Sequence, residues 1–291
     1  MDSLQEAIKK ARLEREGRIG KTAAPGESGA PQSDMPSDSS RSGVAAPTST
    51  TEDQDKRDDQ APTSRPIVHY STTRCVELNR NTLSMNRVIA GDIDDPRVEA
   101  YRQLRSQVLS SMTRNKWQTL AISSAQENAG KTLTAINLAI CISQEVAQTV
   151  MLVDLDLRDP NVHTTLGIDI DKGIVDHLLD GEPLENILIN PEFPRMVVLP
   201  GIPQGRHSSE ILSSPEMTSF MNDITSRYPD RIIIFDLPPL LRNDDAMVFV
   251  PKADAWLLVV EDGATSAYDL ERSLQLLGQS RVIGTVLNKA Q

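Results

Sequence analysis

The stretch "SAQENAGKTLTAINL", residues 124–138, carries the strongest indication of the fold. Its Gly-Lys-Thr triplet opens an apolar, helix-forming run. This is typical of a loop that binds phosphate with backbone N–H groups and a helix N-terminus. In the full pattern G-x-x-x-x-G-K-[ST], the first glycine is replaced here by Ala125. A chance triplet that caps a helix is therefore the alternative interpretation.

Short apolar runs alternate with helical patterns on both sides of this loop. The predicted strands are residues 118–123, 149–154, 195–200, 231–236, 255–261 and 282–288, and the predicted helices among them include 130–146, 214–228 and 266–277. Near-continuous runs of β-branched residues indicate strands that are buried on both faces. We therefore predict an α/β fold with a mostly parallel central sheet flanked by helices.

Acidic side chains fall at the ends of two predicted strands. Asp154 and Asp156 follow one apolar run, and Asp236 ends another, just before two prolines. Ligands of such sheets bind at the carboxyl ends of the strands, so these carboxylates are expected near the phosphate loop. Asp154 and Asp156 are two residues apart and could point to one side, where they would hold Mg²⁺ through water or accept a proton. Arg158 could neutralise phosphate or pair with them.

The chain is predicted to have three parts. Residues 1–16 have a narrow apolar stripe among charges of both signs and form an amphipathic helix, either solvated or docked to a partner. Residues 17–66 are rich in Gly, Ala, Pro, Ser, Thr and charge, which predicts a disordered linker. Residues 67–291 hold the α/β domain. A short strand in "TRCVEL" is possible near its start.

A further helix is predicted over about residues 95–113. Asp95 would be its N-cap and Pro96 its first residue. One apolar face is expected, formed by Val98, Tyr101, Leu104, Val108 and Met112.

Composition narrows the class of protein. The net charge of −11 argues against nucleic acid as a partner, because phosphate binding on that scale needs a basic face. The two cysteines, Cys75 and Cys141, suit a reducing cytoplasm, and no zinc spacing can be built from them. No signal-like or bilayer-length apolar run occurs, so a soluble or peripheral protein is expected.

The segments "AGKTLTAINLA", "VDLDLRDP", "FDLPP" and "VLNK" together resemble the bacterial tyrosine kinases of polysaccharide export, the BY-kinases, of the CpsD/CapB-like cytoplasmic type. These are P-loop proteins related to the Min/Par ATPases. The resemblance runs from about Asp95 to Lys289. It includes "EAYRQLR", where Glu99, Arg102 and Arg105 match the family's E-x-x-R-x-x-R pattern for ring assembly. A solvated charged face is the alternative reading of that helix.

The resemblance implies ATP and Mg²⁺ as ligands of a P-loop kinase or ATPase domain. Lys131, Asp154 and Asp156 would be catalytic, one of the two aspartates being the base. Thr132, Asp154 and Asp236 would hold the metal, with Asp236 in the Walker B position. The nucleotide-binding set would be Gln126, Glu127, Asn128, Ala129, Gly130, Lys131, Thr132, Leu133 and Asn288. Asn288 would contact the adenine edge, although asparagine after a strand is also a common turn residue.

The loop departs from the family pattern at Asn128 and Ala129, and from the related Min/Par pattern at Gln126. Asn128 replaces a glycine, and asparagine is the residue that best tolerates positive φ after glycine. Ala129 lacks the family's carboxylate. Gln126 stands where Min/Par loops carry an extra lysine, which argues against a Min/Par-like positioning ATPase. Nucleotide binding is expected to survive these changes. The rate of catalysis is the property that they put at risk.

The implied function is regulation of exopolysaccharide or capsule polymerisation or export. The protein would act at the inner face of the plasma membrane, beside a membrane-embedded chain-length protein. Family members typically finish in a tyrosine-rich tail, whereas the tyrosines here are dispersed: Tyr70, Tyr101, Tyr228 and Tyr268. We therefore expect either another protein as phosphoacceptor or a nucleotide-gated assembly switch without physiological kinase activity.

Overall fold

The computed structural model describes residues 73–290 except residue 93. The predicted helix 1–16, the predicted linker 17–66 and the first residues of the predicted domain lie outside this part of the chain. They stay predictions.

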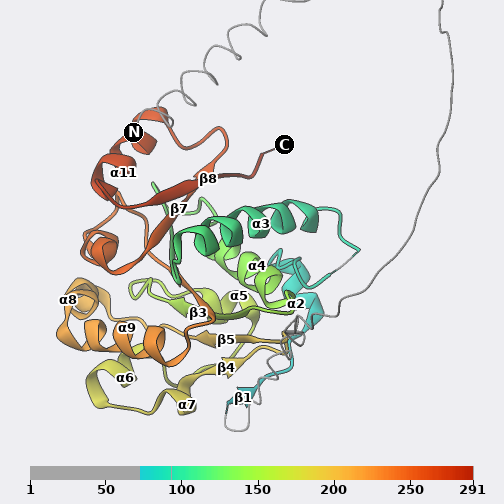
Figure 1. The fold of residues 1–291 in the computed structure, drawn as a ribbon, viewed down its shortest axis with the longest axis vertical. Helices are drawn as coiled ribbons and strands as arrows, with labels where there is room; N and C mark the ends of the chain where they lie inside the picture. The colour runs from blue at the N-terminus through green and yellow to red at the C-terminus, as the bar shows by residue number, and fades with distance from the viewer. Residues whose placement is uncertain (1–72, 93, 291) are drawn as a thin grey trace, which may run out of the picture. The chain divides into compact units, whose positions relative to one another are not determined.

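The described residues form one eight-stranded sheet in the order β1-β4-β5-β3-β6-β2-β7-β8 (Figure 1). The strands are β1 (Arg74–Cys75), β2 (Thr119–Ser124), β3 (Thr149–Asp154), β4 (Ile189–Asn190), β5 (Met196–Leu199), β6 (Arg231–Asp236), β7 (Ala255–Glu261) and β8 (Val282–Asn288). Neighbouring strands are parallel, except that β4 and β5 are antiparallel. The predicted α/β class with a mostly parallel sheet is confirmed.

Hydrophobic cores lie on both faces of this sheet, because successive side chains of a strand point to opposite faces. In β2, Leu120 and Ile122 belong to one core, while Ala121 belongs to the other. All six residues of β2 are buried. This explains why its sequence reads as a continuous apolar run rather than an alternating one.

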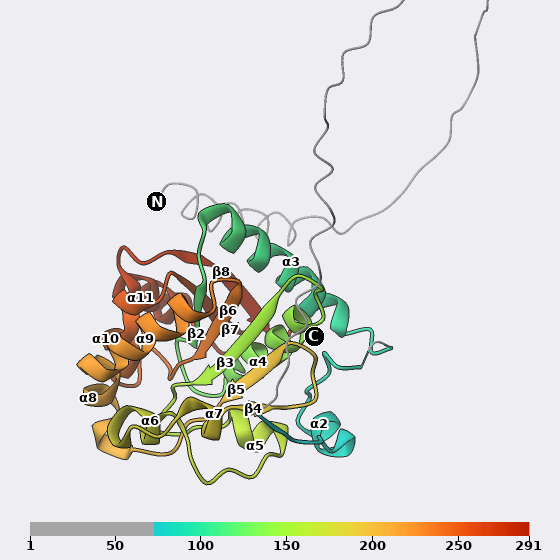
Figure 2. The ribbon, with the colours of Figure 1, turned by 60° about the horizontal axis from the view of Figure 1, so that its bottom comes forward.

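Helices cover each face. The first core is closed by α2 (Arg80–Met85), α3 (Val98–Asn115), α4 (Lys131–Ser143) and α5 (Val162–Leu166). The second lies under α6 (Ile174–Asp180), α7 (Leu184–Ile187), α8 (Ser208–Ser213), α9 (Pro215–Arg227), α10 (Asp245–Phe249) and α11 (Ala267–Leu277), with short 3₁₀ turns η1 (Gly205–His207) and η2 (Val250–Lys252). Figure 1 shows α3 beside α4, and Figure 2 shows α8, α9 and α10 grouped on the other side of the sheet.

The helix predicted with Asp95 as N-cap and Pro96 as first residue begins two residues later, at Val98, and its N-cap is Arg97. A tight turn precedes it. The amide of Val98 donates to the carbonyl of Asp95 at 3.0 Å, and Glu99 donates to Pro96 at 3.4 Å. The Asp95 carboxylate accepts from the backbone of Arg97 at 2.9 Å, so it caps this turn instead of the helix.

The predicted apolar face is confirmed. Val98, Val108 and Met112 are buried, and Tyr101 and Leu104 pack on the same core.

Across the described residues, no helix combines the length and apolar character that crossing a lipid bilayer would require.

Candidate functional site

The phosphate loop predicted from the sequence joins β2 to α4. Helix α4 begins at Lys131, directly after Gly130, whose φ is 91°. Asn128 has a φ of 62°, so asparagine adopts the left-handed conformation expected of it here. A side chain on Gly130 would lie 2.1 Å from Nδ2 of Asn288. Both the positive φ of Gly130 and the close approach of Asn288 therefore favour glycine at position 130.

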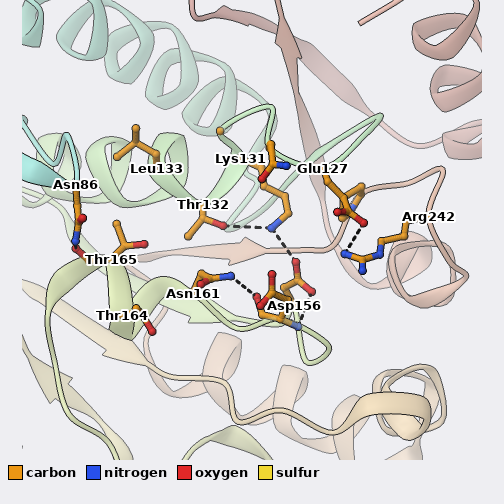
Figure 3. A pocket seen from close by; sticks show the side chains of 14 residues that line it. Asn86, Glu127, Lys131, Thr132, Leu133, Asp156, Asn161, Thr164, Thr165 and Arg242 are labelled. Carbon is orange, nitrogen blue, oxygen red and sulfur yellow. Dashed lines mark hydrogen bonds and ion pairs between the residues drawn. The ribbon is translucent and has the colours of Figure 1, made fainter. Parts of the chain in front are cut away.

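Lys131 lies between two carboxylates that end or follow neighbouring strands. Its Nζ is 2.8 Å from Oδ2 of Asp156 and 3.8 Å from Oδ1 of Asp236. The lysine side chain is only 12% exposed. Figure 3 shows the amine pointing into the cavity between α4 and the loop after β3. The carboxyl ends of β3 and β6 thus meet the start of α4, as expected for a parallel sheet.

Thr132 connects the loop to β6. Its hydroxyl donates to Oδ2 of Asp236 at 2.6 Å and accepts from Lys131 Nζ at 3.2 Å. Oδ1 of Asp236 is buried and accepts no hydrogen bond. A buried carboxylate oxygen of this kind, beside a threonine hydroxyl, suits a hard divalent cation such as Mg²⁺.

Burial dominates the electrostatics of this group. It raises the pKa of Asp236 to about 6, against the opposing attraction of Lys131. The pKa of Asp154 is raised well above its ordinary value by burial and by the neighbouring Asp236. Burial by itself lowers the pKa of Lys131, but Asp236 and Asp156 outweigh it and the net shift is upward. The lysine is therefore held as a cation close to Asp154 and Asp236, two carboxyl groups that burial makes costly to charge.

Asp154 and Asp156, which were expected to act from one side, differ in their hydrogen bonds and in their access to the cavity. Asp154 is the last residue of β3 and is fully buried; its two oxygens accept from the amides of Asp156 at 3.2 Å and Val162 at 3.0 Å. Asp156 lies beyond the strand and faces the cavity. The period of two applies only within a strand, and β3 ends at Asp154. Asp154 therefore shapes the loop, and Asp156 is the carboxylate available in the cavity.

The cavity at this site has a volume of about 350 Å³ (Figure 3). Its described lining residues are Asn86, Glu127, Asn128, Gly130, Lys131, Thr132, Leu133, Asp156, Asp159, Asn161, Thr164, Thr165, Pro239 and Arg242. Most of the predicted nucleotide-binding residues are among them. The other three do not line the cavity. Gln126 donates to Asp269 at 2.9 Å, Ala129 is buried, and Asn288 donates to the carbonyl of Ala129 at 2.9 Å.

Arg158 does not pair with Asp154 or Asp156. Its guanidinium makes two 2.8 Å hydrogen bonds to Asp245 in α10, and Asp245 also accepts from the Ser208 hydroxyl at 2.6 Å. Asp245 is completely buried, so it needs these donors. This bidentate pair fixes the loop that carries Asp156. No sequence pattern indicated it, because Asp245 lies 87 residues from Arg158.

The three residues of the predicted assembly motif differ in their surroundings. Arg102 and Glu99 form a 3.5 Å ion pair along α3, and the Glu99 side chain is 59% exposed. Arg105 turns inward, 2.9 Å from Glu145 and 3.4 Å from the carbonyl of Cys141. Glu99 and Arg102 therefore remain at the surface, whereas Arg105 also ties α3 to α4.

The arrangement can bind polyphosphate. Backbone amides at the start of α4 and the Lys131 amine supply positive charge, and Asp156 supplies a base. Among the described residues, no three acidic, histidine or cysteine side chains converge to hold a metal ion by themselves. A cation here would thus draw its other ligands from phosphate and water, which is the usual coordination of Mg²⁺.

Comparison with protein families gives one model, AAA_31, described as an AAA domain, which matches residues 117–284. That match covers more than half of the chain and spans the whole site except Asn86 and Asn288.

Individual relatives point to kinases and to polysaccharide transport. The tyrosine-protein kinase YwqD of Bacillus subtilis is 29% identical over 215 residues, which cover 72% of this chain and 89% of YwqD. The succinoglycan biosynthesis transport protein ExoP of Rhizobium meliloti is 28% identical, covering 75% of this chain and 28% of ExoP. The kinase domain of the Escherichia coli tyrosine kinase ETK has a TM-score of 0.62 at 26% identity, covering 70% of this chain and 82% of that domain. The predicted resemblance to the BY-kinases is confirmed.

Proposed function

We propose that this chain, which belongs to the AAA_31 family of AAA domains, is an ATP-dependent protein-tyrosine kinase that regulates exopolysaccharide or capsule production. One observation carries the proposal. Lys131, at the start of α4, lies 2.8 Å from Asp156 and 3.8 Å from Asp236 inside a cavity large enough for a polyphosphate. A cation, a base and a helix N-terminus in one cavity are the parts that phosphoryl transfer needs.

The geometry suggests how binding and chemistry are connected. In this structure Lys131 neutralises Asp156. Phosphate oxygens that bind Lys131 would compete with that ion pair and free the Asp156 carboxylate. Asp156 would then accept the proton of a tyrosine hydroxyl. The tyrosine oxygen would attack the terminal phosphorus of ATP, and ADP would leave. Asp154 would hold the loop that aims Asp156, because its oxygens already accept two backbone amides.

Thr132 and Asp236 are the residues we assign to Mg²⁺. The ion would supply neutralisation of phosphate charge. The unbonded Oδ1 of Asp236 and the Thr132 hydroxyl fit this role. Backbone amides of residues 127–131 would hold the phosphates without a change of protonation, so most of the catalysis would come from positioning.

The partner we propose is a membrane-embedded polysaccharide chain-length or co-polymerase protein, with the chain working at the cytoplasmic face. The name of ExoP supports a link to polysaccharide transport. The name of YwqD, of whose length the match covers 89%, supports a tyrosine kinase.

A nucleotide-gated assembly switch is the second candidate. The surface pair of Glu99 and Arg102 on α3 favours it, because an ion pair this long and this accessible could be exchanged for pairs with a second copy. In that case ATP would order a ring and its hydrolysis would release it, without a protein substrate.

Phosphoryl transfer distinguishes the two. The full chain, Lys131→Met and Asp156→Asn would each be incubated with Mg²⁺ and γ-labelled ATP, alone and with a cytoplasmic fragment of the membrane partner. The kinase predicts label on protein tyrosine from the wild type only. Nucleotide binding and assembly without any label under either condition would reject the kinase and leave the switch. Absence of nucleotide binding would reject both.

A further inference from the structure

Arg242 and Glu127 form an ion pair on one side of the cavity. The Nη1 of Arg242 lies 2.6 Å from Oε1 of Glu127. Figure 3 shows the pair beside Lys131 and Asp156, and both residues line the cavity. Glu127 belongs to the phosphate loop itself. A carboxylate in that loop repels an incoming phosphate unless a cation neutralises it.

Among the described lining residues, only Lys131 and Arg242 have cationic side chains. Lys131 is already shared between Asp156 and Asp236. The lining also contains Glu127, Asp156 and Asp159, so its side chains carry more negative than positive charge. A nucleoside triphosphate adds several further negative charges. Arg242 is thus the cation best able to change partner when phosphate arrives.

The backbone that carries Arg242 is anchored to the phosphate loop. Leu240 donates to the carbonyl of Ser124 at 2.8 Å, and Leu241 donates to that of Ala125 at 3.2 Å. The Arg242 side chain is 47% exposed and the Glu127 side chain 49%. Ion pairs exposed to this extent contribute little stability, so breaking this pair costs little. Rotation of one side chain on a fixed backbone would therefore be enough to redirect Arg242.

We propose that Arg242 exchanges Glu127 for the terminal phosphate of a bound nucleoside triphosphate, and so acts as a catalytic residue that senses that phosphate. The inference rests on the proposed function, because it needs a nucleotide in this cavity. Arginine offers a planar fork of donors that matches phosphate oxygens in bidentate geometry. The side of the cavity that holds Arg242 also holds Asp156, the proposed base, so the terminal phosphate is the one within its reach.

A simpler role for Arg242 can be distinguished from phosphate binding by experiment. Arg242 could serve only as the counter-ion of Glu127, keeping the loop neutral. In that case removing both charges together would restore binding. If Arg242 binds phosphate, removing both charges would leave the defect, because the phosphate contact is still missing.

The test measures the affinities of the full chain for ATP and ADP by calorimetry with Mg²⁺, for the wild type, Arg242→Gln, Glu127→Gln and the double variant. We expect Arg242→Gln to weaken ATP binding by about 10- to 100-fold and ADP binding by less than about 3-fold. The double variant should stay within about 3-fold of Arg242→Gln. Glu127→Gln alone should bind ATP at least as tightly as the wild type. Arg227→Gln is the control, since it removes a similarly exposed pair, Arg227–Asp223 at 3.0 Å, on α9.

Restored ATP affinity in the double variant would overturn the proposal in favour of the counter-ion role. Unchanged ATP affinity in Arg242→Gln, or equal losses for ATP and ADP, would also overturn it. Failure of the proposed function would give a different result in the same binding measurements. There the wild type itself would show no nucleotide binding, or binding would be indifferent to Lys131→Met.

Discussion

The side-chain amide of Asn288, at the end of β8, donates a 2.9 Å hydrogen bond to the carbonyl of Ala129 in the phosphate loop, 159 residues earlier in the chain. The same Nδ2 fills the space that a side chain on Gly130 would need. The last strand of the sheet therefore supports the phosphate loop directly. This contact gives Asn288 a role that differs from the adenine contact implied by the family resemblance.

Nucleotide selectivity separates these two roles. If Asn288 supports the loop, Asn288→Ala should weaken ATP and GTP binding by the same factor, about 3- to 10-fold for one lost hydrogen bond. A contact to the adenine edge would instead make the loss larger for ATP and lower the ATP-to-GTP preference. Competition binding with both nucleotides measures this ratio, and a changed preference would contradict the supporting role.

Gly130→Ala should abolish nucleotide binding. The new methyl would overlap Nδ2 of Asn288, at a φ of 91°. Either Asn288 gives up its hydrogen bond to Ala129 or the loop moves, and both changes disturb the phosphate loop. Gly181→Ala is the matched control. Gly181 also has positive φ, 70°, but nothing lies within 4 Å of the added carbon. That variant should cost about 1 kcal/mol of stability for the left-handed conformation and leave nucleotide affinity unchanged. Equal effects of the two variants on nucleotide affinity would show that the close approach is irrelevant.

Asp236→Asn should stabilise the nucleotide-free protein in a pH-dependent way. Burial raises the pKa of Asp236 from 3.8 to about 6. The raised folded-state pKa gives stability that is fully present below the unfolded pKa and is lost as pH rises through about 6. A permanently neutral asparagine avoids that loss, so the variant should be more stable by up to roughly 3 kcal/mol at about pH 7.5, with the difference vanishing near pH 4. Chemical denaturation across this range measures it. A variant that is less stable than the wild type at neutral pH would contradict the assignment.

Asn137, in α4, secures the segment before α3. Its Oδ1 accepts from the amides of Ile89 at 2.8 Å and Ala90 at 2.9 Å, both buried. Asn137→Ala leaves these donors without an acceptor and should lower the free energy of unfolding by about 2–4 kcal/mol. Asn115→Ala, at the exposed end of α3, is the control and should change it by less than about 0.5 kcal/mol. Urea denaturation of both variants tests this, and similar losses would refute the role of Asn137.

Local patterns predicted the sheet well. The strands ending at Asp154 and Asp236 have the predicted ends, because each is a buried apolar run closed by a charge. The predicted first residue of α3, Pro96, was two residues too early, since Asp95 and Pro96 suit a tight turn as well as a helix start. Lys131, Thr132 and Asp156 could be assigned to one site because parallel strands bring their ends together.

Contacts between distant segments could not be predicted. The pairs Arg158–Asp245 and Glu127–Arg242 join side chains with no shared periodicity or spacing. Their partners depend on how the loops after β2 and β3 lie against the chain after β6, which is set by tertiary packing. The different surroundings of Asp154 and Asp156 likewise depend on the path of the loop after β3.

The most direct test of the account is calorimetric binding of ATP with Mg²⁺ to the full chain and to Lys131→Met. Lys172→Met is the control, because Lys172 forms a surface pair with Glu182 at 2.9 Å. The account predicts that the wild type and Lys172→Met bind with the same affinity, while Lys131→Met binds about 100-fold more weakly or not at all, as expected when a buried phosphate-binding cation is lost. Equal affinity of all three proteins, or no binding by the wild type, would contradict it.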